Sequence, residues 1–347
     1  MPFEVMLSLI SGALQDADHH SVEFIWHGGE TTLLPISFYE KAVFLQSQFR
    51  HAGQVVRNSI QTNGTRLTNE WIGFFRANQF TVGVSLDGPP ELNDCLRVHP
   101  SGRGSSTEIR RGMDLLREGG VPFSVLMVID EDSLAIGPDR IFDFLLSSGV
   151  KSVGLLAAKP LNHSSADPGT QVPHYVDPQR MGVFLKGIYD RWLIEGADSM
   201  HIRELDSLSA RIRNDSARTC TLSGNCFGKY FLVEPDGTVA HCDVFDGDDG
   251  YTLGNVMREN FAAIRATPRL ESLRADWQSD RNQMAGCPEF GVCQGWCPHE
   301  SYVSRRHNLS HSPGCCGLRG LIEHVRSKMA TRASIKLIPI QGCTPEL

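Results

Sequence analysis

The sequence predicts an α/β protein, with a parallel sheet made of successive βα units followed by a smaller cysteine-rich domain. Over residues 1–160, short apolar segments alternate with amphipathic segments at a spacing of roughly 30–40 residues, which is typical of βα units. Nine of the ten cysteines lie after residue 219, and this asymmetry indicates a second domain. With 347 residues, 41% of them hydrophobic, the chain can fill a substantial core.

Five strands are expected in the first part of the chain, over 22–27, 56–61, 80–86, 122–129 and 152–158. Four segments between them carry apolar residues at helical intervals: "SFYEKAVFLQSQF", "NEWIGFFRAN", "STEIRRGMDLLREGG" and "DRIFDFLLSSG". The chain begins with a helix-like segment over residues 1–14, with Pro2 in its first turn. If the sheet is a βα barrel, its first strand and the loop after that strand are therefore absent.

The pattern changes after residue 160. A loop rich in Pro, Ser, His and Asp over 160–176 leads to an amphipathic helix around 178–195, and the cysteine-rich region follows. We therefore place a domain boundary near residue 200, which divides the chain into residues 1–200, residues 201–335 and a tail over 336–347.

Charge and hydropathy exclude some classes of partner. The net charge of −7 and the pI near 6.0 argue against a nucleic-acid-binding surface, which normally carries a basic excess. No apolar run approaches the ~18 residues that a membrane span needs, and the N-terminus lacks the pattern of a secretory signal. We therefore expect a cytoplasmic protein whose partners are small molecules or peptides.

Three of the predicted strands end alike, in "FIWHGGE", "SIQTNG" and "VGVSLDG". For one pair of glycines the ordinary explanation is a tight turn, because glycine adopts positive φ without strain. Three such endings in successive βα units favour a ligand site, since the carboxyl ends of parallel strands meet at one edge of a sheet or barrel.

The cysteine-rich region indicates metal binding rather than disulfides in a chain with no export signal. A hairpin with its turn at Asp236 and Gly237 is expected to precede one of the cysteines. Thiolates bind zinc or iron-sulfur clusters, and spacing alone does not decide between them, although the CxxC knuckles that zinc prefers are absent. The candidate ligands are Cys220, Cys226, Cys242, Cys287, Cys293, Cys297, Cys315 and Cys316.

The run "CTLSGNCFGKYFLVEPDGTVAHCDVF", with "CPEFGVCQGWCPHE" and "CC" after it, resembles the SPASM domain of radical-SAM enzymes. It is most similar to the anaerobic sulfatase-maturating enzymes and related peptide-modifying maturases, in which "HGGE", "QTNG" and "SLDG" recur in the same order. The resemblance implies a partial (β/α)6 barrel and a radical-SAM oxidoreductase. Such an enzyme acts on a side chain of a peptide or protein, either a sulfatase Cys or Ser that becomes formylglycine or a precursor peptide that is matured.

The resemblance also implies roles for individual residues. The glycine motif would hold the amino group of S-adenosylmethionine through Gly28, Gly29 and Glu30. The next two strand ends would face the same cavity with Gln61, Thr62 and Asn63, and with Ser85 and Asp87 near the ribose and carboxylate. Asp243 matches the acid that takes a proton when the substrate radical is oxidised, with an ordinary aspartate in a turn as the alternative.

Two auxiliary 4Fe–4S clusters are implied. The first would be bound by Cys220, Cys226, Cys242 and Cys297, and the second by Cys287, Cys293 and either Cys315 or Cys316. The family has a further cysteine three residues before Cys287, where this chain has Met284. The second cluster would then lack a ligand, take both cysteines of the vicinal pair, or take an exogenous ligand. Cys95 and Cys343 match no motif.

Radical-SAM chemistry also needs a CxxxCxxC loop for a third cluster, and this chain has no cysteine before Cys95. We favour a chain that starts within a longer protein over one that has lost the chemistry, and we do not expect the 347 residues as written to reduce S-adenosylmethionine. A flavodoxin or ferredoxin is expected as electron carrier. The alternatives are a catalytically inactive iron-sulfur protein that binds a partner, and a zinc-stabilised α/β protein.

Overall fold

A six-stranded parallel sheet forms the first part of the protein, with its strands in chain order from β1 to β6. The computed structural model describes all residues except 17–19, 160–174, 197–198, 218, 309–310 and 337–347, so most of the loop expected over 160–176 and nearly all of the tail lie outside the described residues. The strands are β1 (Ser21–Trp26), β2 (Val55–Thr62), β3 (Thr81–Ser85), β4 (Phe123–Ile129), β5 (Ser152–Ala157) and β6 (His201–Ile202).

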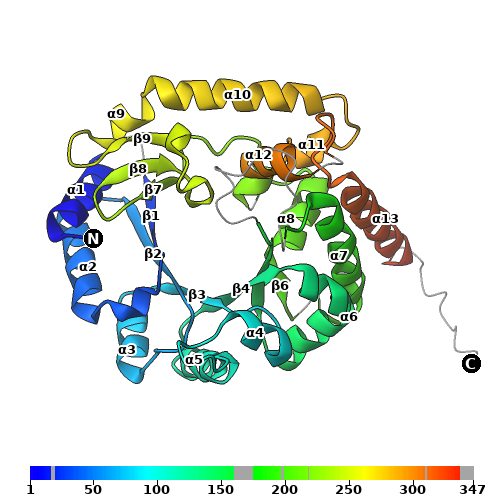
Figure 1. Cartoon of the computed structure of the whole chain (residues 1–347), viewed down its shortest axis with the longest axis horizontal. Helices are drawn as coiled ribbons and strands as arrows, with labels where there is room; N and C mark the ends of the chain where they lie inside the picture. Colours follow the sequence, from blue (N-terminus) through cyan, green and yellow to red (C-terminus); the bar gives the residue numbers. More distant parts are fainter. Residues whose placement is uncertain (17–19, 160–174, 197–198, 218, 309–310, 337–347) are drawn as a thin grey trace, which may run out of the picture.

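The five predicted strands are confirmed, and β6 is an additional strand that pairs with β5 through two residues only. Helices follow the strands and cover the outer face of the curved sheet (Figure 1). They are α1 (Phe3–Leu14), α2 (Ile36–Phe49), α3 (Asn69–Ala77), α4 (Pro90–Leu96), α5 (Ser106–Glu118), α6 (Glu131–Ser147), α7 (Pro178–Arg191) and α8 (Arg203–Ile212). Among the described residues, no helix is both long and apolar enough to span a bilayer.

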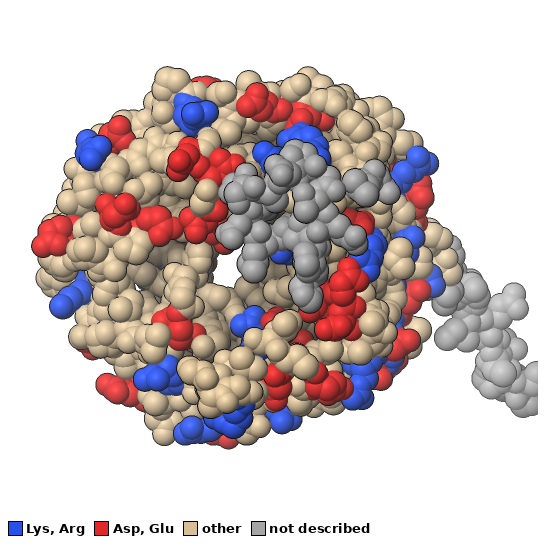
Figure 2. Space-filling model, in the orientation of Figure 1, with Lys and Arg blue, Asp and Glu red and all other residues tan. Residues whose placement is uncertain are grey.

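The alternation of side chains along the strands separates a buried face from an open one. In β2, Asn58, Ile60 and Thr62 are buried under the helices, whereas the residues between them are only partly covered. Ile25 of β1 and Leu156 of β5 are 53% and 39% exposed although both lie within strands. The inner face of the sheet therefore borders a hollow, which is visible near the centre of the molecule in Figure 2. We call this hollow the lumen.

The cysteine-rich part has a second, smaller sheet. Strands β7 (Phe231–Val233), β8 (Thr238–His241) and β9 (Thr252–Asn255) are antiparallel, and the hairpin turn at Gly237, with φ of 88°, confirms the predicted turn. The helices of this part are α9 (Phe261–Arg265), α10 (Pro268–Met284), α11 (Phe290–Cys293), α12 (Pro298–His307) and α13 (Arg319–Lys336). Its core also includes Val5 of α1, so the first helix of the chain joins the two parts.

Alanine substitutions at two helical glycines test how tightly the helices pack on the sheet. At Gly112 of α5, an added Cβ would lie 2.2 Å from the carbonyl oxygen of Gly64, in the loop after β2. At Gly73 of α3 it would meet nothing within 4 Å. We expect Gly112→Ala to lower the free energy of unfolding by about 1–3 kcal/mol through overpacking. Gly73→Ala should raise it by about 0.5–1 kcal/mol, because alanine favours the helix. Urea unfolding measures both, and equal effects would contradict the packing described.

Candidate active site and cluster-binding cysteines

The loop after β1 passes through two glycines with left-handed backbone. Gly28 and Gly29 have φ of 96° and 53°, values that side chains rarely adopt. An added Cβ at either position would meet no atom within 4 Å, so the conformation and not crowding requires glycine here. Both residues are exposed at the carboxyl edge of the sheet. The structure thus places the "HGGE" backbone where a ligand can approach it closely.

The carboxylate of Glu30 ties this loop to the end of β2. Its Oε1 atom accepts hydrogen bonds from the amide and hydroxyl of Thr32, at 2.9 and 2.5 Å, and from Thr62 Oγ1 at 2.6 Å. Its Oε2 atom accepts one from the backbone N–H of Asn63 at 2.8 Å. Four donors from two loops therefore hold the carboxylate in place, and Oε2 keeps acceptor capacity for a further donor.

Gln61 joins the ends of β2 and β3. Its Nε2 donates to Ser85 Oγ at 2.9 Å, and its backbone carbonyl accepts from Thr31 Oγ1 at 2.7 Å. The side chain lies across Gly83, where an added Cβ would be 2.0 Å from Gln61 Oε1. The predicted site residues of the first three strand ends are thus brought together at one edge of the sheet.

Asp87 is buried, and both of its carboxylate oxygens bond other residues of the protein. Oδ2 forms an ion pair with Arg97 Nε at 2.7 Å, and Oδ1 accepts from the backbone N–H of Val128 at 2.9 Å. These contacts fix the "SLDG" turn to α4 and β4. The structure therefore gives Asp87 a positioning role beside Ser85.

The four thiols predicted to bind the first cluster lie near one another in the structure. We call Cys220, Cys226, Cys242 and Cys297 the first thiol group. Cys226 lies within electrostatic range of Cys220, Cys242 and Cys297. Burial raises the pKa of Cys226 to about 11, and burial likewise raises the pKa of Cys297. Deprotonating these thiols inside the protein is therefore unfavourable unless a cation compensates, which is what a metal cluster supplies.

A buried histidine accompanies this group, and sequence analysis did not identify it. His241 has no exposed surface, and its Nε2 lies 3.8 Å from Cys226 Sγ while its ring stacks on Phe227 at 4.2 Å. Burial lowers the pKa of His241 to about 4, so the ring is neutral at neutral pH. A neutral ring beside a ligating sulfur can donate to it through one nitrogen, a contact of the kind that tunes cluster potentials.

The second group consists of Cys287, Cys293 and the vicinal pair. Cys315 is hydrogen bonded to Cys287, and Cys316 is hydrogen bonded to both Cys293 and Cys315. No three His, Cys, Asp or Glu side chains of the described chain converge closely enough to hold a single metal ion. A four-iron cluster is larger than one ion and spaces its four thiolates more widely, so the lack of a single-ion site among the described residues does not count against a cluster.

Two side chains connect the first thiol group with the lumen. Tyr230 is within electrostatic range of Cys220 and of Glu23 on β1. Arg203 lies over β5, where an added Cβ at Gly154 would be 2.9 Å from Cζ, and its charge also acts on Cys220. The first group therefore faces the hollow that the sheet encloses. No local motif signals these two residues, because their partners are distant in the sequence.

Asp243 follows Cys242 directly and is exposed. The thiol of Cys242 donates to Asp243 Oδ1 at 3.2 Å. Burial raises the pKa of this thiol, and the neighbouring Asp243 charge adds to the shift. The predicted base is thus in contact with one predicted cluster ligand.

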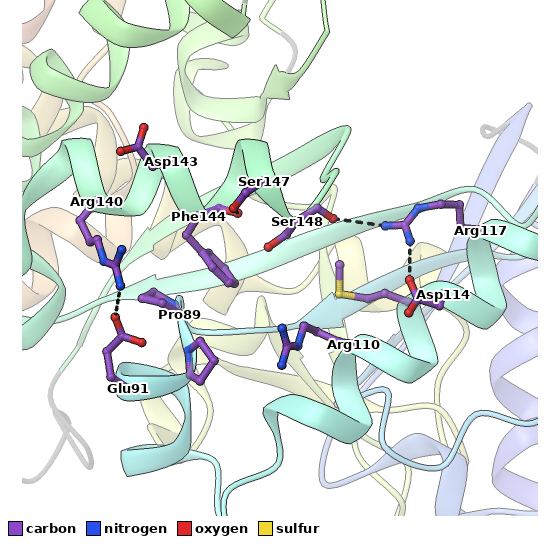
Figure 3. A pocket seen from close by; sticks show the side chains of 12 residues that line it. Pro89, Glu91, Arg110, Asp114, Arg117, Arg140, Asp143, Phe144, Ser147 and Ser148 are labelled. Atoms are coloured by element: carbon purple, nitrogen blue, oxygen red, sulfur yellow. Dashed lines mark hydrogen bonds and ion pairs between the residues drawn. The ribbon is translucent and has the colours of Figure 1, made fainter.

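A separate pocket lies among α4, α5 and α6, on the helical side of the sheet (Figure 3). Its volume is about 520 Å3. Two arginines that line it are paired with carboxylates, Arg140 with Glu91 at 2.7 Å and Arg117 with Asp114 at 2.5 Å. None of the predicted site residues lines this pocket, so it is distinct from the strand-end site.

Comparison with protein families identifies the class of the protein. Residues 10–135 match the radical SAM superfamily, and residues 225–294 match the SPASM iron-sulfur cluster-binding domain. The fold is also that of anSMEcpe solved with bound AdoMet and Cp18Cys peptide, with a TM-score of 0.84 at 24% identity over 97% of this chain and 92% of that one. The protein is therefore a radical-SAM enzyme with a SPASM domain, as the sequence predicts.

Individual relatives define the family within this class. The serine-type anaerobic sulfatase-maturating enzyme of Bacteroides thetaiotaomicron is 30% identical over 345 residues, which are 95% of this chain and 82% of that enzyme. The cysteine-type enzyme of Clostridium novyi is 27% identical over 332 residues, 95% of this chain and 87% of that enzyme. The chain belongs to the family of anaerobic sulfatase-maturating enzymes.

Thiol reactivity in the metal-free protein provides a test of the two groups. Hydrogen bonds from Cys316 and Cys287 and from the Gly317 backbone lower the pKa of Cys315 to about 5, whereas burial raises that of Cys226 to about 11. Thiolates form above the pKa, so we expect iodoacetamide to alkylate Cys315 at a constant rate between about pH 6 and about pH 9 and Cys226 only above that range. Mass spectrometry of quenched samples measures this. A steep rise for Cys315 across the range would refute the assignment.

Proposed function

We propose that this protein binds S-adenosylmethionine at the ends of β1, β2 and β3 and takes part in oxidising a Cys or Ser side chain of a peptide to formylglycine. One observation carries this proposal. The strand ends and the first thiol group border the same lumen, with Tyr230 and Arg203 between the two parts. A substrate side chain in the lumen would thus meet both the cofactor site and an electron acceptor.

For the cofactor, the proposed contacts are the backbone of Gly28 and Gly29 and the free acceptor capacity of Glu30 Oε2, which suits an ammonium group. Gln61, Thr62, Asn63, Ser85 and Asp87 shape the same edge. Most of their polar atoms already bond each other, which favours a positioning role. The site is preorganised, because these bonds are formed without the ligand.

For the auxiliary clusters, we propose Cys220, Cys226, Cys242 and Cys297 as one ligand set, and Cys287, Cys293 and either Cys315 or Cys316 as the other. A 4Fe–4S cluster supplies one-electron transfer when bound. Ligation removes the thiol proton of Cys242, so Asp243 loses that donor and can accept a proton from substrate. Asp243 is therefore the proposed general base.

The partners and domains follow from the same proposal. The relatives are named for serine-type and cysteine-type sulfatase maturation, so the proposed substrate is a peptide or protein with one of these residues. A flavodoxin or ferredoxin is the proposed electron carrier. We propose a boundary near residue 200, with β6 as the last strand of the barrel sheet.

The thiolates that would hold the S-adenosylmethionine-cleaving cluster do not occur in the 347 residues. The first cysteine, Cys95, lies in α4 with its thiol on the Glu91 carbonyl at 3.1 Å. The residues present do not fit that cluster, and no cleavage step is assigned to them. The second candidate function is an iron-sulfur protein that binds a partner without radical chemistry.

Binding of S-adenosylmethionine tests the cofactor site. Gly28→Ala should weaken binding about tenfold, because an alanine at this φ shifts the backbone that meets the ligand. Gly53→Ala is the matched control: Gly53 has φ of 80°, and an added Cβ there also meets nothing within 4 Å, but it lies in the turn before β2. Calorimetry of the reconstituted protein measures both. Equal affinities for the two variants would remove the support for this site.

Iron content and nucleoside products test whether the 347 residues bind two clusters and whether they cleave S-adenosylmethionine. The reconstituted 347-residue chain should hold roughly eight irons, and with dithionite it should form no 5′-deoxyadenosine above background, because the 347 residues contain no CxxxCxxC loop. Mass spectrometry of nucleosides and colorimetric iron analysis provide the readouts. Release of 5′-deoxyadenosine would show that other residues support the cleavage, and fewer than about four irons would end the cluster proposal.

A further inference from the structure

The second thiol group forms an unbroken series of contacts. Cys287 contacts Cys315, Cys315 contacts Cys316, and Cys316 contacts Cys293, each through a hydrogen bond or electrostatic interaction between sulfur atoms. Cys316 is central to this series, because it is hydrogen bonded to Cys315 on one side and to Cys293 on the other. The side chains of Cys315 and Cys316 therefore belong to one cluster of thiols, in which Cys315 meets Cys287 and Cys316 meets Cys293.

Backbone N–H groups point at two of these sulfurs. The N–H of Gly295 donates to Cys293 Sγ at 3.4 Å, and the N–H of Gly317 donates to Cys315 Sγ at 3.4 Å. Both glycines have left-handed backbone, with φ of 90° and 89°, which aims each N–H back at the cysteine two residues earlier. Such N–H donors to sulfur stabilise a ligating thiolate.

Met284 cannot fill the role of a fourth ligand in this group. Its side chain is 4% exposed and packs in the core of the cysteine-rich part with Phe261 and Trp277. Cys316 borders the same core, and it also borders the core of the barrel. The fourth sulfur of the group is therefore the second cysteine of the vicinal pair.

We propose that Cys287, Cys293, Cys315 and Cys316 together ligate one 4Fe–4S cluster, so that two consecutive residues bind the same cluster and no iron is left open. Each thiol loses its proton to solvent when its sulfur ligates an iron of the cluster. This inference rests on the proposed function only in that it requires the SPASM part to bind clusters. It requires neither S-adenosylmethionine nor a substrate.

The first test needs no substitution. The cluster-loaded protein is treated anaerobically with iodoacetamide and compared with the same protein after iron removal by a chelator. We expect Cys315 and Cys316 both to be protected by the cluster, while the exposed Cys95 reacts equally in both samples. Alkylation of either member of the pair in the loaded protein would overturn the inference.

The second test counts iron in a background where Cys226→Ser and Cys242→Ser remove the first cluster. This background should keep roughly four irons. Adding Cys315→Ser or Cys316→Ser should lower that number to about three or fewer and produce the paramagnetic signal of an oxidised three-iron cluster. Adding Cys95→Ser should change nothing. A single-cysteine variant of the pair with all its iron and an unaltered spectrum would refute shared ligation.

Binding of an exogenous ligand tests directly whether every iron of the cluster has a protein thiolate. Cyanide added to the reduced background protein should leave its paramagnetic spectrum unaltered, because every iron already has a protein thiolate. A shifted spectrum would reveal an open iron and overturn the inference. If the unaltered protein binds no iron at all, the cluster assignment itself fails. Roughly eight irons with Cys316 alkylated would instead reject only the shared ligation.

Discussion

The arrangement of the candidate site depends on the hydrogen bonds that the carboxylate of Glu30 accepts. It accepts hydrogen bonds from the loop after β1 and from the loop after β2, so the two strand ends are held as one unit. Gln61 extends this unit to β3 through Ser85, and Asp87 extends it to β4. Each bond satisfies a polar group at the edge of a buried sheet, where an unpaired group would cost about 1–3 kcal/mol. The glycines of "HGGE" can therefore keep an exposed left-handed backbone because the residues around them are fixed.

A second set of contacts holds the cysteine-rich part against the barrel. Lys159, just after β5, pairs with Glu300 of α12 at 2.5 Å, and both side chains are largely buried. Glu289 is buried and paired with Arg326 of α13, whose helix packs on α7 and α8. A buried pair of this kind is costly to break, because the remaining charge has no compensation. These contacts keep the first thiol group at the lumen, and local sequence could not predict them, since Lys159 and Glu300 are 141 residues apart.

Much of the fold follows from local patterns. The five βα strands, the hairpin at Gly237 and the three glycine-containing strand ends all depend on periodicity or on turn chemistry, and the structure confirms them. β6 was not predicted because two residues carry no alternation, and they form a strand only because β5 offers a free edge. The same limit applies to the site. Spacing from Cys297 favours Cys315 slightly over Cys316, and only the folded chain shows that both meet the other thiols. Arg203, Tyr230 and His241 acquire their significance from neighbours that the sequence does not place beside them.

The glycines within the inner face of the sheet have a consequence for how the lumen can vary. Gly83 leaves room for Gln61, and Gly154 leaves room for Arg203, each at a distance that excludes a Cβ. A strand glycine and the long polar side chain across it therefore form a complementary pair, in which the glycine can gain a side chain only if the facing side chain moves or shortens. Within related chains, a bulkier residue at position 83 should occur with a shorter one at position 61, and positions 154 and 203 should vary together in the same way. The shape of the lumen is therefore set by pairs of facing residues and not by single positions.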